Sequence, residues 1–304
     1  MTTRRTIIAG GAGLLLSGCV GAEQAHTNVP SVQPQRVSDA GERFRGVHDH
    51  IGGRLGVCAI DTGSGRSTGY RTGQRFAMAS TFKWLLAAGI LKRAQHGMSL
   101  DDHALFVRAD LVGHSPVCEA RIDPETGIGR MTLEELCAAT VTVSDNCAAN
   151  LRLVPMFGPE GLTRFFREAG DSVTRLDRNE PDLNENAPGD ERDTTTPEAM
   201  ARTAARILTT DAVLNTAMRD KLIGWMRAST TGLDRLRAGL PAEWNSGDKT
   251  GTGGNGSHND VAIAFPPGRA PIVIASYISE SSAPNGVKAT AHAEVARIVA
   301  KEFG

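Results

Sequence analysis

The sequence has little of several features that would each indicate a particular class of protein. Only 5% of its 304 residues are aromatic, which disfavours a surface on which sugars or bases stack. Basic and acidic residues nearly cancel, at 33 and 34, so the chain lacks the cationic excess that nucleic-acid binding needs. No Cys-x-x-Cys motif occurs, and the eight histidines are scattered apart from His48 and His50. A catalytic zinc site is therefore not expected.

The rest of the composition is that of a globular protein. Apolar residues make up 40% of the chain and charged residues 22%, which excludes a disordered or collagen-like chain. The length allows one large domain or two interleaved lobes with a sizeable core, and it exceeds that of a small scaffold held together by disulfides.

The N-terminal segment resembles an export signal rather than part of the fold. Arg4 and Arg5 precede a mildly apolar stretch over residues 7–16, which is too short to span a bilayer. The run Leu-Ser-Gly-Cys that ends at Cys19 resembles a lipobox, in which the cysteine is lipidated and becomes the new N-terminus. An ordinary cleaved signal with a chance cysteine is the alternative. We expect export by the twin-arginine pathway and a membrane-anchored lipoprotein that faces the periplasm or the cell exterior.

This interpretation divides the chain into three parts. Residues 1–18 would be the twin-arginine lipoprotein signal peptide. Residues 19–39 are rich in Thr, Ser, Pro and Gln and have no hydrophobic period, so we expect a flexible tether. The folded domain would span residues 40–304.

Four cysteines remain in the folded domain: Cys58, Cys118, Cys137 and Cys147. In an exported protein an even number allows a disulfide framework, and four cysteines can pair in three ways. The twin-arginine pathway carries folded proteins out of a reducing cytoplasm, so buried free thiols are the alternative that we favour.

Strand patterns occupy both ends of the folded domain, and helical patterns occupy its middle. Such an order predicts an α+β fold, in which an antiparallel sheet from both chain ends forms one lobe and the intervening chain forms an all-helical lobe. The sheet lobe would comprise residues 40–79 and 230–304, and the helical lobe residues 80–229. A cleft between two lobes is a natural site. The predicted strands are 55–61, 67–71, 246–252, 259–265 and 272–279, and the predicted helices are 80–94, 132–141, 146–157, 215–227, 287–303 and one that opens at Pro197.

Ser80 and Lys83 stand three residues apart near the start of a predicted helix, so both side chains project from one face. A serine hydroxyl is a poor nucleophile at neutral pH, and a lysine whose pKa is lowered by burial or by nearby positive charge can take its proton. Alone the pair is a weak signal, because Ser-x-x-Lys is common on solvated helices.

Two further motifs strengthen the catalytic interpretation. The run Ser144-Asp145-Asn146 lies between two predicted helices, and the run Lys249-Thr250-Gly251 lies on the first strand of the C-terminal group. The three motifs occur in the order known for class A β-lactamases and penicillin-binding proteins. From about Asp39 to its C-terminus, the chain resembles a class A serine β-lactamase of the penicillin-binding-protein-like serine acyltransferase superfamily.

The resemblance implies roles for three catalytic residues. Ser80 would be the nucleophile that attacks the β-lactam carbonyl. Lys83 would help to deprotonate it, and Ser144 would pass the proton to the leaving nitrogen.

The resemblance also implies how substrate is bound. Lys249 and Thr250 would hold the substrate carboxylate, with Gly251 letting the ligand approach the strand edge. Asn146 would bond the acylamino side chain. The backbone N–H groups of Ser80 and Thr252 would form the oxyanion hole.

A fourth motif separates hydrolases from relatives that only become acylated. Residues 178–184, Arg-Asn-Glu-Pro-Asp-Leu-Asn, resemble the start of the Ω-shaped loop of class A enzymes. In that loop Glu180 and Asn184 would hold one water against the acyl-enzyme. Arg178 and Asp193 would close the loop with an ion pair. Whether Glu180 or Lys83 is the base for acylation is left open.

Five flanking positions bear on specificity. Arg235 resembles an arginine that supplements carboxylate binding, with a solvent-facing arginine as the alternative. His114 lies where the family carries a gate residue, with a surface histidine as the alternative. Ala79 is not the cysteine of the disulfide typical of class A carbapenemases, so carbapenem hydrolysis is not expected as the main activity. Gly253 and Gly254 leave space compatible with cephalosporins.

Together these features lead to one main functional hypothesis and two alternatives. The main hypothesis is hydrolysis of penicillins and cephalosporins through an acyl-serine intermediate, without metal or organic cofactor, by a monomer that confers β-lactam resistance and binds no nucleic acid. One alternative is a penicillin-binding D,D-peptidase or β-lactam sensor that acylates without turnover. The other is an inactive surface lipoprotein that binds wall fragments.

Overall fold

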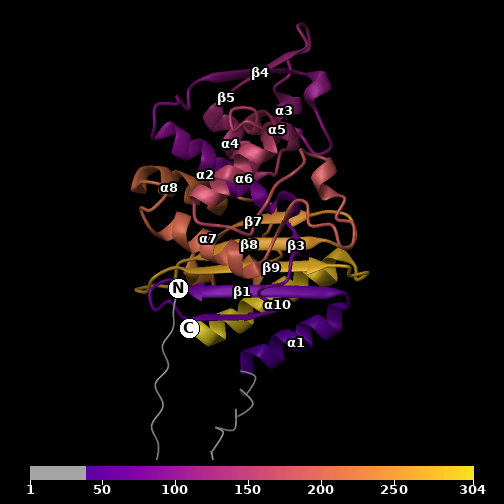
Figure 1. Cartoon of the computed structure of the whole chain (residues 1–304), viewed down its shortest axis with the longest axis vertical. Helices are drawn as coiled ribbons and strands as arrows, with labels where there is room; N and C mark the ends of the chain where they lie inside the picture. Colours follow the sequence, from indigo (N-terminus) through magenta and orange to yellow (C-terminus); the bar gives the residue numbers. More distant parts are fainter. Residues whose placement is uncertain (1–38) are drawn as a thin grey trace, which may run out of the picture. The chain divides into compact units, whose positions relative to one another are not determined.

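A computed structural model of the chain describes residues 39–304, and the predicted signal peptide, Cys19 and nearly all of the predicted tether lie outside them. The folded part contains a five-stranded sheet with the order β2-β1-β9-β8-β7, in which every neighbouring pair is antiparallel. The indigo β1 lies beside the golden β9 in Figure 1, so the two ends of the domain share one sheet. The strands are β1 (Arg54–Asp61), β2 (Ser67–Tyr70), β7 (Gly247–Thr252), β8 (His258–Ala264) and β9 (Ile272–Ser279).

The central strands are buried on both faces, and alternate residues contribute to two different cores. Along β1, Leu55 and Val57 belong to the core under the terminal helices, whereas Cys58 and Ile60 belong to the core shared with the helical lobe. This alternation follows from the two-residue period of a strand. The helices α1 (Asp39–Ile51), α9 (Leu236–Gly239) and α10 (Asn285–Phe303) cover the first face, and α7 (Pro197–Thr209) packs against β1, β8 and β9 on the other.

The helical lobe is organised around one buried helix. In α2 (Phe82–Ala94) every residue from Phe82 to Leu91 is buried, as expected for a helix that is apolar on all sides. Its neighbours are α4 (Leu133–Thr142), α5 (Asn146–Leu153), α6 (Gly158–Glu168) and α8 (Thr216–Arg227). The shorter elements are α3 (Pro116–Ala120), β3 (Phe76–Ala77), β4 (His103–Val107), β5 (Ile128–Thr132), β6 (Thr194–Thr195) and 3-10 turns at Ala79–Thr81, Arg108–Asp110, Asp182–Asn184 and Ala242–Trp244.

The predicted α+β fold class is confirmed, with several local differences. Residues 80–229 are not all helical, because β4 and β5 pair as an antiparallel hairpin. The helix predicted over 146–157 ends at Leu153, and Gly158-Pro159 begins α6 rather than only stopping its predecessor, because proline suits the first turn of a helix. Helix α1 was not predicted. Its buried stripe of Ala40, Phe44, Val47 and Ile51 follows a helical period.

The four cysteines at 58, 118, 137 and 147 are buried and unpaired, as favoured from the sequence. Burial raises the pKa of Cys58 and of Cys137 to about 12, so neither is a ready nucleophile. Within residues 39–304, no helix combines the length and apolar character needed to cross a bilayer.

Candidate active site

The Ser80 hydroxyl lies on a 3-10 turn directly before α2. The preceding residue, Ala79, has a φ of +45°, a left-handed conformation that costs a non-glycine residue about 1–2 kcal/mol. Surrounding contacts hold the turn in place. The Asn259 amide donates to the carbonyls of Ala77 and Met78, and the Thr81 hydroxyl donates to Met78 O at 2.9 Å. The turn therefore presents Ser80, which is half-buried, from a fixed backbone.

Lys83 is fully buried beneath this turn and has four oxygen neighbours. Its Nζ donates to Ser144 O at 2.7 Å, Ser144 Oγ at 3.3 Å and Asn146 Oδ1 at 2.5 Å, and it lies 3.0 Å from Glu180 Oε1. Burial lowers the pKa of Lys83 below its usual 10.5, and the Glu180 carboxylate opposes that shift. The amine is thus placed to exchange a proton with its neighbours.

Ser144 lies between Lys83 and a second buried lysine. Its backbone has a φ of +63°, which turns the chain between α4 and α5. Its hydroxyl accepts from Lys83 Nζ and, at 3.0 Å, from Lys249 Nζ on β7. Lys249 also donates to Thr250 O at 2.7 Å. Burial, and next the charge of Lys83, hold the pKa of Lys249 well below its usual 10.5. One hydroxyl thereby links two amines across the lobes.

Asp145 holds the neighbouring backbone and was not given a role from the sequence. Its carboxylate caps α5 by accepting from Ala148 N at 2.9 Å, and it also accepts from Val117 N and Cys118 N of α3. A short polar side chain before a helix is a recognisable cap, but its second set of partners lies 27 and 28 residues away.

Glu180 is buried and contacts the nucleophile directly. The Ser80 hydroxyl donates to Glu180 Oε1 at 3.2 Å, and the Asn184 amide donates to Oε2 at 2.5 Å. The carboxylate therefore joins Ser80, Lys83 and Asn184 in one network.

Two sets of contacts position the loop that carries Glu180. Asn150 on α5 bonds both backbone groups of Glu180, with Glu180 N donating to Oδ1 at 3.0 Å and Nδ2 donating to Glu180 O at 2.8 Å. The predicted ion pair between Arg178 and Asp193 is confirmed, at 2.6 Å. Asn150 was missed in the sequence because it belongs to no motif and lies 30 residues from Glu180.

The glycines after Lys249 allow close packing of the protein's own backbone. A Cβ at Gly251 would lie 2.6 Å from Met78 O and 3.2 Å from Ser80 N, so this glycine lets the nucleophile turn contact β7. A Cβ at Gly254 would lie 2.5 Å from Glu185 O, and Gly254 N donates to Asn184 O. On this side, Gly253 and Gly254 thus lie against the backbone of the loop that carries Glu180.

The remaining predicted residues have the following contacts. Arg235 donates to Gly251 O at 3.0 Å, Asn259 O at 2.8 Å and Thr252 Oγ1 at 2.9 Å, which excludes a freely solvated side chain. The Thr250 hydroxyl bonds Thr231 Oγ1 at 2.7 Å. The exposed His114 ring bonds Val143 O at 2.9 Å.

The fold and the site define a class of protein: an α+β serine acyl-transfer enzyme in which a buried lysine and glutamate meet at the nucleophile. A family model described as the beta-lactamase enzyme family matches residues 40–303. β-Lactamase AST-1 of Nocardia asteroides is 45% identical, covering 99% of this chain and 96% of its own. The carbapenem-hydrolyzing β-lactamase KPC of Klebsiella oxytoca is also 45% identical, covering 80% and 81%.

Solved structures agree with these relatives. The structure of an ancestral (GNCA) class A β-lactamase matches with a TM-score of 0.83 at 50% identity, covering 87% of this chain and all of that one. The chain belongs to the class A serine β-lactamase family and is a serine hydrolase.

Proposed function

We propose that this protein hydrolyses the β-lactam ring of penicillins and cephalosporins through an acyl-serine intermediate on Ser80. The observation that carries the proposal is the contact of the Glu180 carboxylate with both the Ser80 hydroxyl and the Asn184 amide. A relative that only becomes acylated has no need of such a pair. Glu180 and Asn184 supply what turnover requires, a base and a second anchor for one water next to the acyl ester.

Acylation forms a bond between Ser80 Oγ and the lactam carbonyl carbon and then breaks the ring C–N bond. The Ser80 proton passes to Glu180 or to Lys83, both of which are in the network. A proton reaches the departing nitrogen through Ser144, whose hydroxyl lies between Lys83 and Lys249. Backbone N–H groups of Ser80 and Thr252 stabilise the oxyanion.

Deacylation reverses the roles of the groups around Ser80. Glu180 takes a proton from the water while the water oxygen bonds to the ester carbon. The bond between that carbon and Ser80 Oγ then breaks. Ser80 Oγ regains a proton from Glu180 through the contact of 3.2 Å, which restores the starting state.

The substrate class follows from the charge of the site. Lys249, Thr250 and Arg235 form a cationic and hydroxyl-rich edge for the carboxylate of the antibiotic. Asn146, whose Oδ1 accepts from Lys83 Nζ, would bond its acylamino group. Because Ala79 supplies no thiol beside the nucleophile, penicillins and cephalosporins are proposed as the main substrates, and carbapenems as minor ones.

The proposal is tested by nitrocefin turnover together with mass spectrometry after exposure to penicillin. We expect wild-type turnover with no lasting adduct, and an adduct that persists in Glu180→Ala. A lasting adduct on the wild-type protein would instead support a D,D-peptidase or sensor. No nitrocefin turnover by the wild type, together with no adduct on Ser80 in either folded protein, would support a non-catalytic lipoprotein.

We also propose that the protein is exported through the twin-arginine pathway, anchored by a lipid on Cys19, and acts as a monomer that confers β-lactam resistance. Export and the lipid anchor are supported by the Arg4-Arg5 pair and the lipobox-like run that ends at Cys19. In cells fed a tagged fatty acid, the wild type should be labelled and pellet with membranes, whereas Cys19→Ser should be unlabelled. Equal labelling of both would contradict the anchor, and light scattering of the purified protein checks the monomer.

A further inference from the structure

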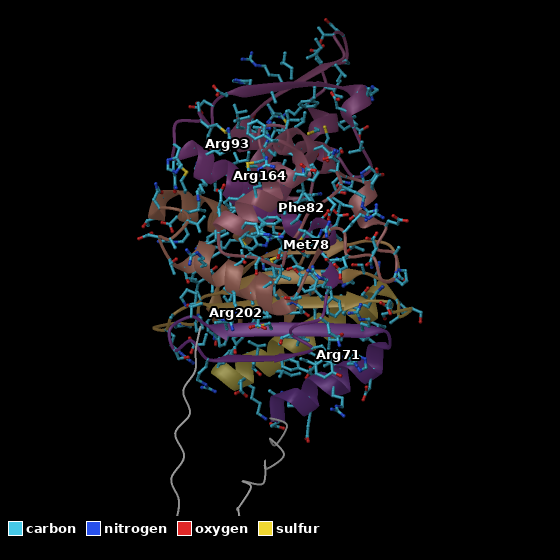
Figure 2. All side chains as sticks on the ribbon, in the orientation of Figure 1. Arg71, Met78, Phe82, Arg93, Arg164 and Arg202 are labelled. Carbon is cyan, nitrogen blue, oxygen red and sulfur yellow. The ribbon has the colours of Figure 1, made fainter. Side chains whose placement is uncertain are left out.

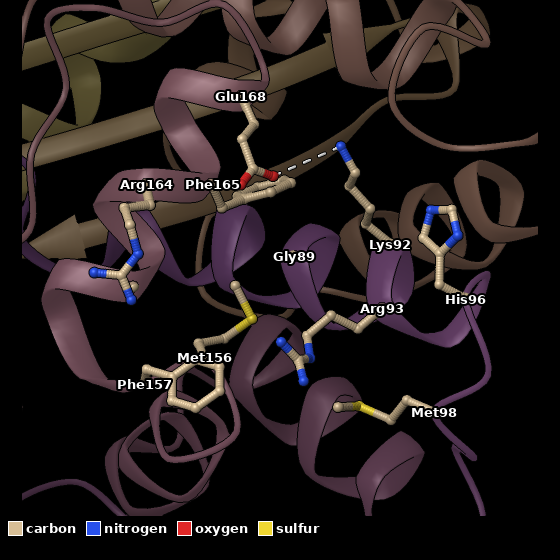
Figure 3. Close-up of a pocket in the computed structure, with 11 residues that line it drawn as sticks. Gly89, Lys92, Arg93, His96, Met98, Met156, Phe157, Arg164, Phe165 and Glu168 are labelled. Carbon is tan, nitrogen blue, oxygen red and sulfur yellow. Dashed lines mark ion pairs between the residues drawn. The ribbon is translucent and has the colours of Figure 1, made fainter.

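A cavity of about 630 Å³ lies between the C-terminal end of α2 and α6, within the helical lobe (Figure 3). Small-molecule sites typically enclose about 300–1,000 Å³, so the cavity can hold a ligand of ordinary size. Ten helical residues separate Lys83 from Arg93, which corresponds to about 15 Å along α2. In Figure 2, Arg93 and Arg164 lie in the helical lobe, whereas Met78 and Phe82 mark the nucleophile turn next to the sheet. The cavity is therefore separate from the site at Ser80.

The cavity is lined by more positive than negative charge. Lys92 and Arg93 come from the last turn of α2, and Arg164 comes from α6, while Glu168 is the only acid among the lining residues. Lys92 Nζ lies 3.9 Å from Glu168 Oε2, which is longer than a hydrogen bond. Within residues 39–304, Arg164 has no ion pair or side-chain hydrogen bond. Most of this positive charge is thus uncompensated by the protein.

Arg93 has a donor that its surroundings leave unused. Its Nε is buried, yet it has no hydrogen-bond partner within the described part of the chain. A buried donor without a partner is unfavourable by about 1–3 kcal/mol, so a ligand oxygen that reached it would gain more than at a solvated arginine. The guanidinium carbon lies 5.5 Å from the ring centre of Phe157, which holds the group over an aromatic face.

Apolar side chains line the cavity beside these cations. Met156 and Phe165 are buried, and Phe157 is 72% exposed, an unusual state for a large aromatic residue. A Cβ at Gly89 would lie 2.8 Å from Met156 Cε and 3.4 Å from Phe165 Cδ1, so the glycine lets both side chains close against α2. In the view of Figure 3, the thioether of Met156 lies between the guanidinium groups of Arg93 and Arg164.

We propose that this cavity binds a small aromatic carboxylate, with its ring against Met156 and Phe157 and its carboxylate hydrogen-bonded to Arg93, while Arg164 adds positive charge from the other side of Met156. Planar guanidinium groups bind carboxylates through paired hydrogen bonds, and the apolar lining explains why the ligand carries a ring rather than being an inorganic anion. The site is independent of β-lactam hydrolysis, so the inference stands or fails apart from the proposed function.

The test is calorimetric titration of the purified protein with 2-naphthoate and with its neutral amide. We expect saturable binding of the carboxylate, at least tenfold weaker binding of the amide, and affinity that falls as salt rises. Binding should weaken at least tenfold in Arg93→Gln and about two- to threefold in Arg164→Gln, whose exposed charge acts from farther away. Arg164 is exposed, so its replacement leaves the fold intact even if that of the half-buried Arg93 does not.

The control is Arg297→Gln, which removes an exposed arginine of α10 that pairs with Glu294. Its affinity for 2-naphthoate should equal that of the wild type. The proposal is overturned by equal binding to the wild type and Arg164→Gln, by equal binding of acid and amide, or by no saturable binding at millimolar concentration. Loss of nitrocefin turnover at Ser80 would bear on the proposed function and leave this result untouched.

Discussion

The two ends of α2 carry cations in opposite situations. At its first turn Lys83 is fully buried, and its Nζ has oxygen neighbours from Ser144, Asn146 and Glu180 within 3.3 Å. At its last turn Lys92 and Arg93 are half-buried, and the Nε of Arg93 has no partner within residues 39–304. The same helix therefore carries one cation whose donors bond to protein oxygens and a second cation with a donor that has no partner among the described residues.

A charge that the protein satisfies and a charge with an unused donor suit different roles, proton transfer and ligand binding. A buried charge persists only where partners are supplied, and those partners fix both its position and its pKa. Lys83 is fixed in this way and suits proton transfer. A cation that lies beside a cavity and has an unpaired hydrogen-bond donor suits a ligand that supplies the acceptor. The following changes test the two assignments.

The largest effect is expected from Lys83→Ala. Removing the amine leaves Glu180 and Ser144 without the group that links them, so kcat/KM for nitrocefin should fall about 10²–10⁴-fold, the range for loss of a general acid or base. Lys92→Ala, at the other end of the same helix, is the matched control and should retain wild-type kinetics. Similar losses in both variants would contradict the distinction between the two ends.

A smaller loss of activity is expected when the hydrogen bonds that position Glu180 are removed and Lys83 is kept. Asn150→Ala deletes two hydrogen bonds to the backbone of Glu180, so the carboxylate should drift from the ester and deacylation should slow by about 10–100-fold. Acylation should slow less, giving a burst in stopped-flow traces. The control is Asn179→Ala, which replaces the exposed residue before Glu180 and should show no burst. Equal slowing of acylation and deacylation in Asn150→Ala would contradict a positioning role for Asn150.

The burial of Lys83 has a consequence for pH dependence. Because its pKa is below 10.5 in the folded protein, the neutral amine forms at lower pH than in a solvated lysine, and acylation that uses it should rise along a limb below pH 10.5. Glu180 raises the pKa of Lys83, so Glu180→Gln should move that limb to lower pH. The position of the limb is measured from single-turnover acylation rates across a range of pH. A limb that moves to higher pH would show that Glu180 does not act on Lys83 in this way.

The sequence identified the residues of the Ser80 network, but it did not identify the residues that hold them in position. Ser80, Lys83, Ser144, Glu180 and Lys249 occur in short motifs whose spacing reflects local geometry, and the structure brings all of them into one network. Their roles in the reaction remain predictions. Asn150 and the α3 contacts of Asp145 could not be found in the same way, because each depends on residues brought together by packing over about 30 positions of chain.

The fold shows the same limit. Strands β1, β8 and β9 were predicted because strongly apolar runs mark buried strands, whereas α1 lies in a polar stretch where only a sparse stripe is apolar. The backbone contacts of Gly251 and Gly254 were not predicted, because a sequence does not show which backbone approaches a glycine. The cavity at the end of α2 was also missed, since its residues come from separate helices and form no motif.

The smallest effect is expected from Glu168→Gln, which removes the only acid of the cavity. Glu168 is exposed and lies 3.9 Å from the half-buried Lys92, so the free energy of unfolding should change by less than about 0.5 kcal/mol in urea titrations. Without that negative charge, 2-naphthoate should bind about two- to threefold more tightly, an electrostatic gain of the size expected near a protein surface. Glu294→Gln, on α10 in the sheet lobe, should leave the affinity unchanged. Weaker binding in Glu168→Gln would mean that the glutamate assists the ligand, and the cationic account of the cavity would have to be given up.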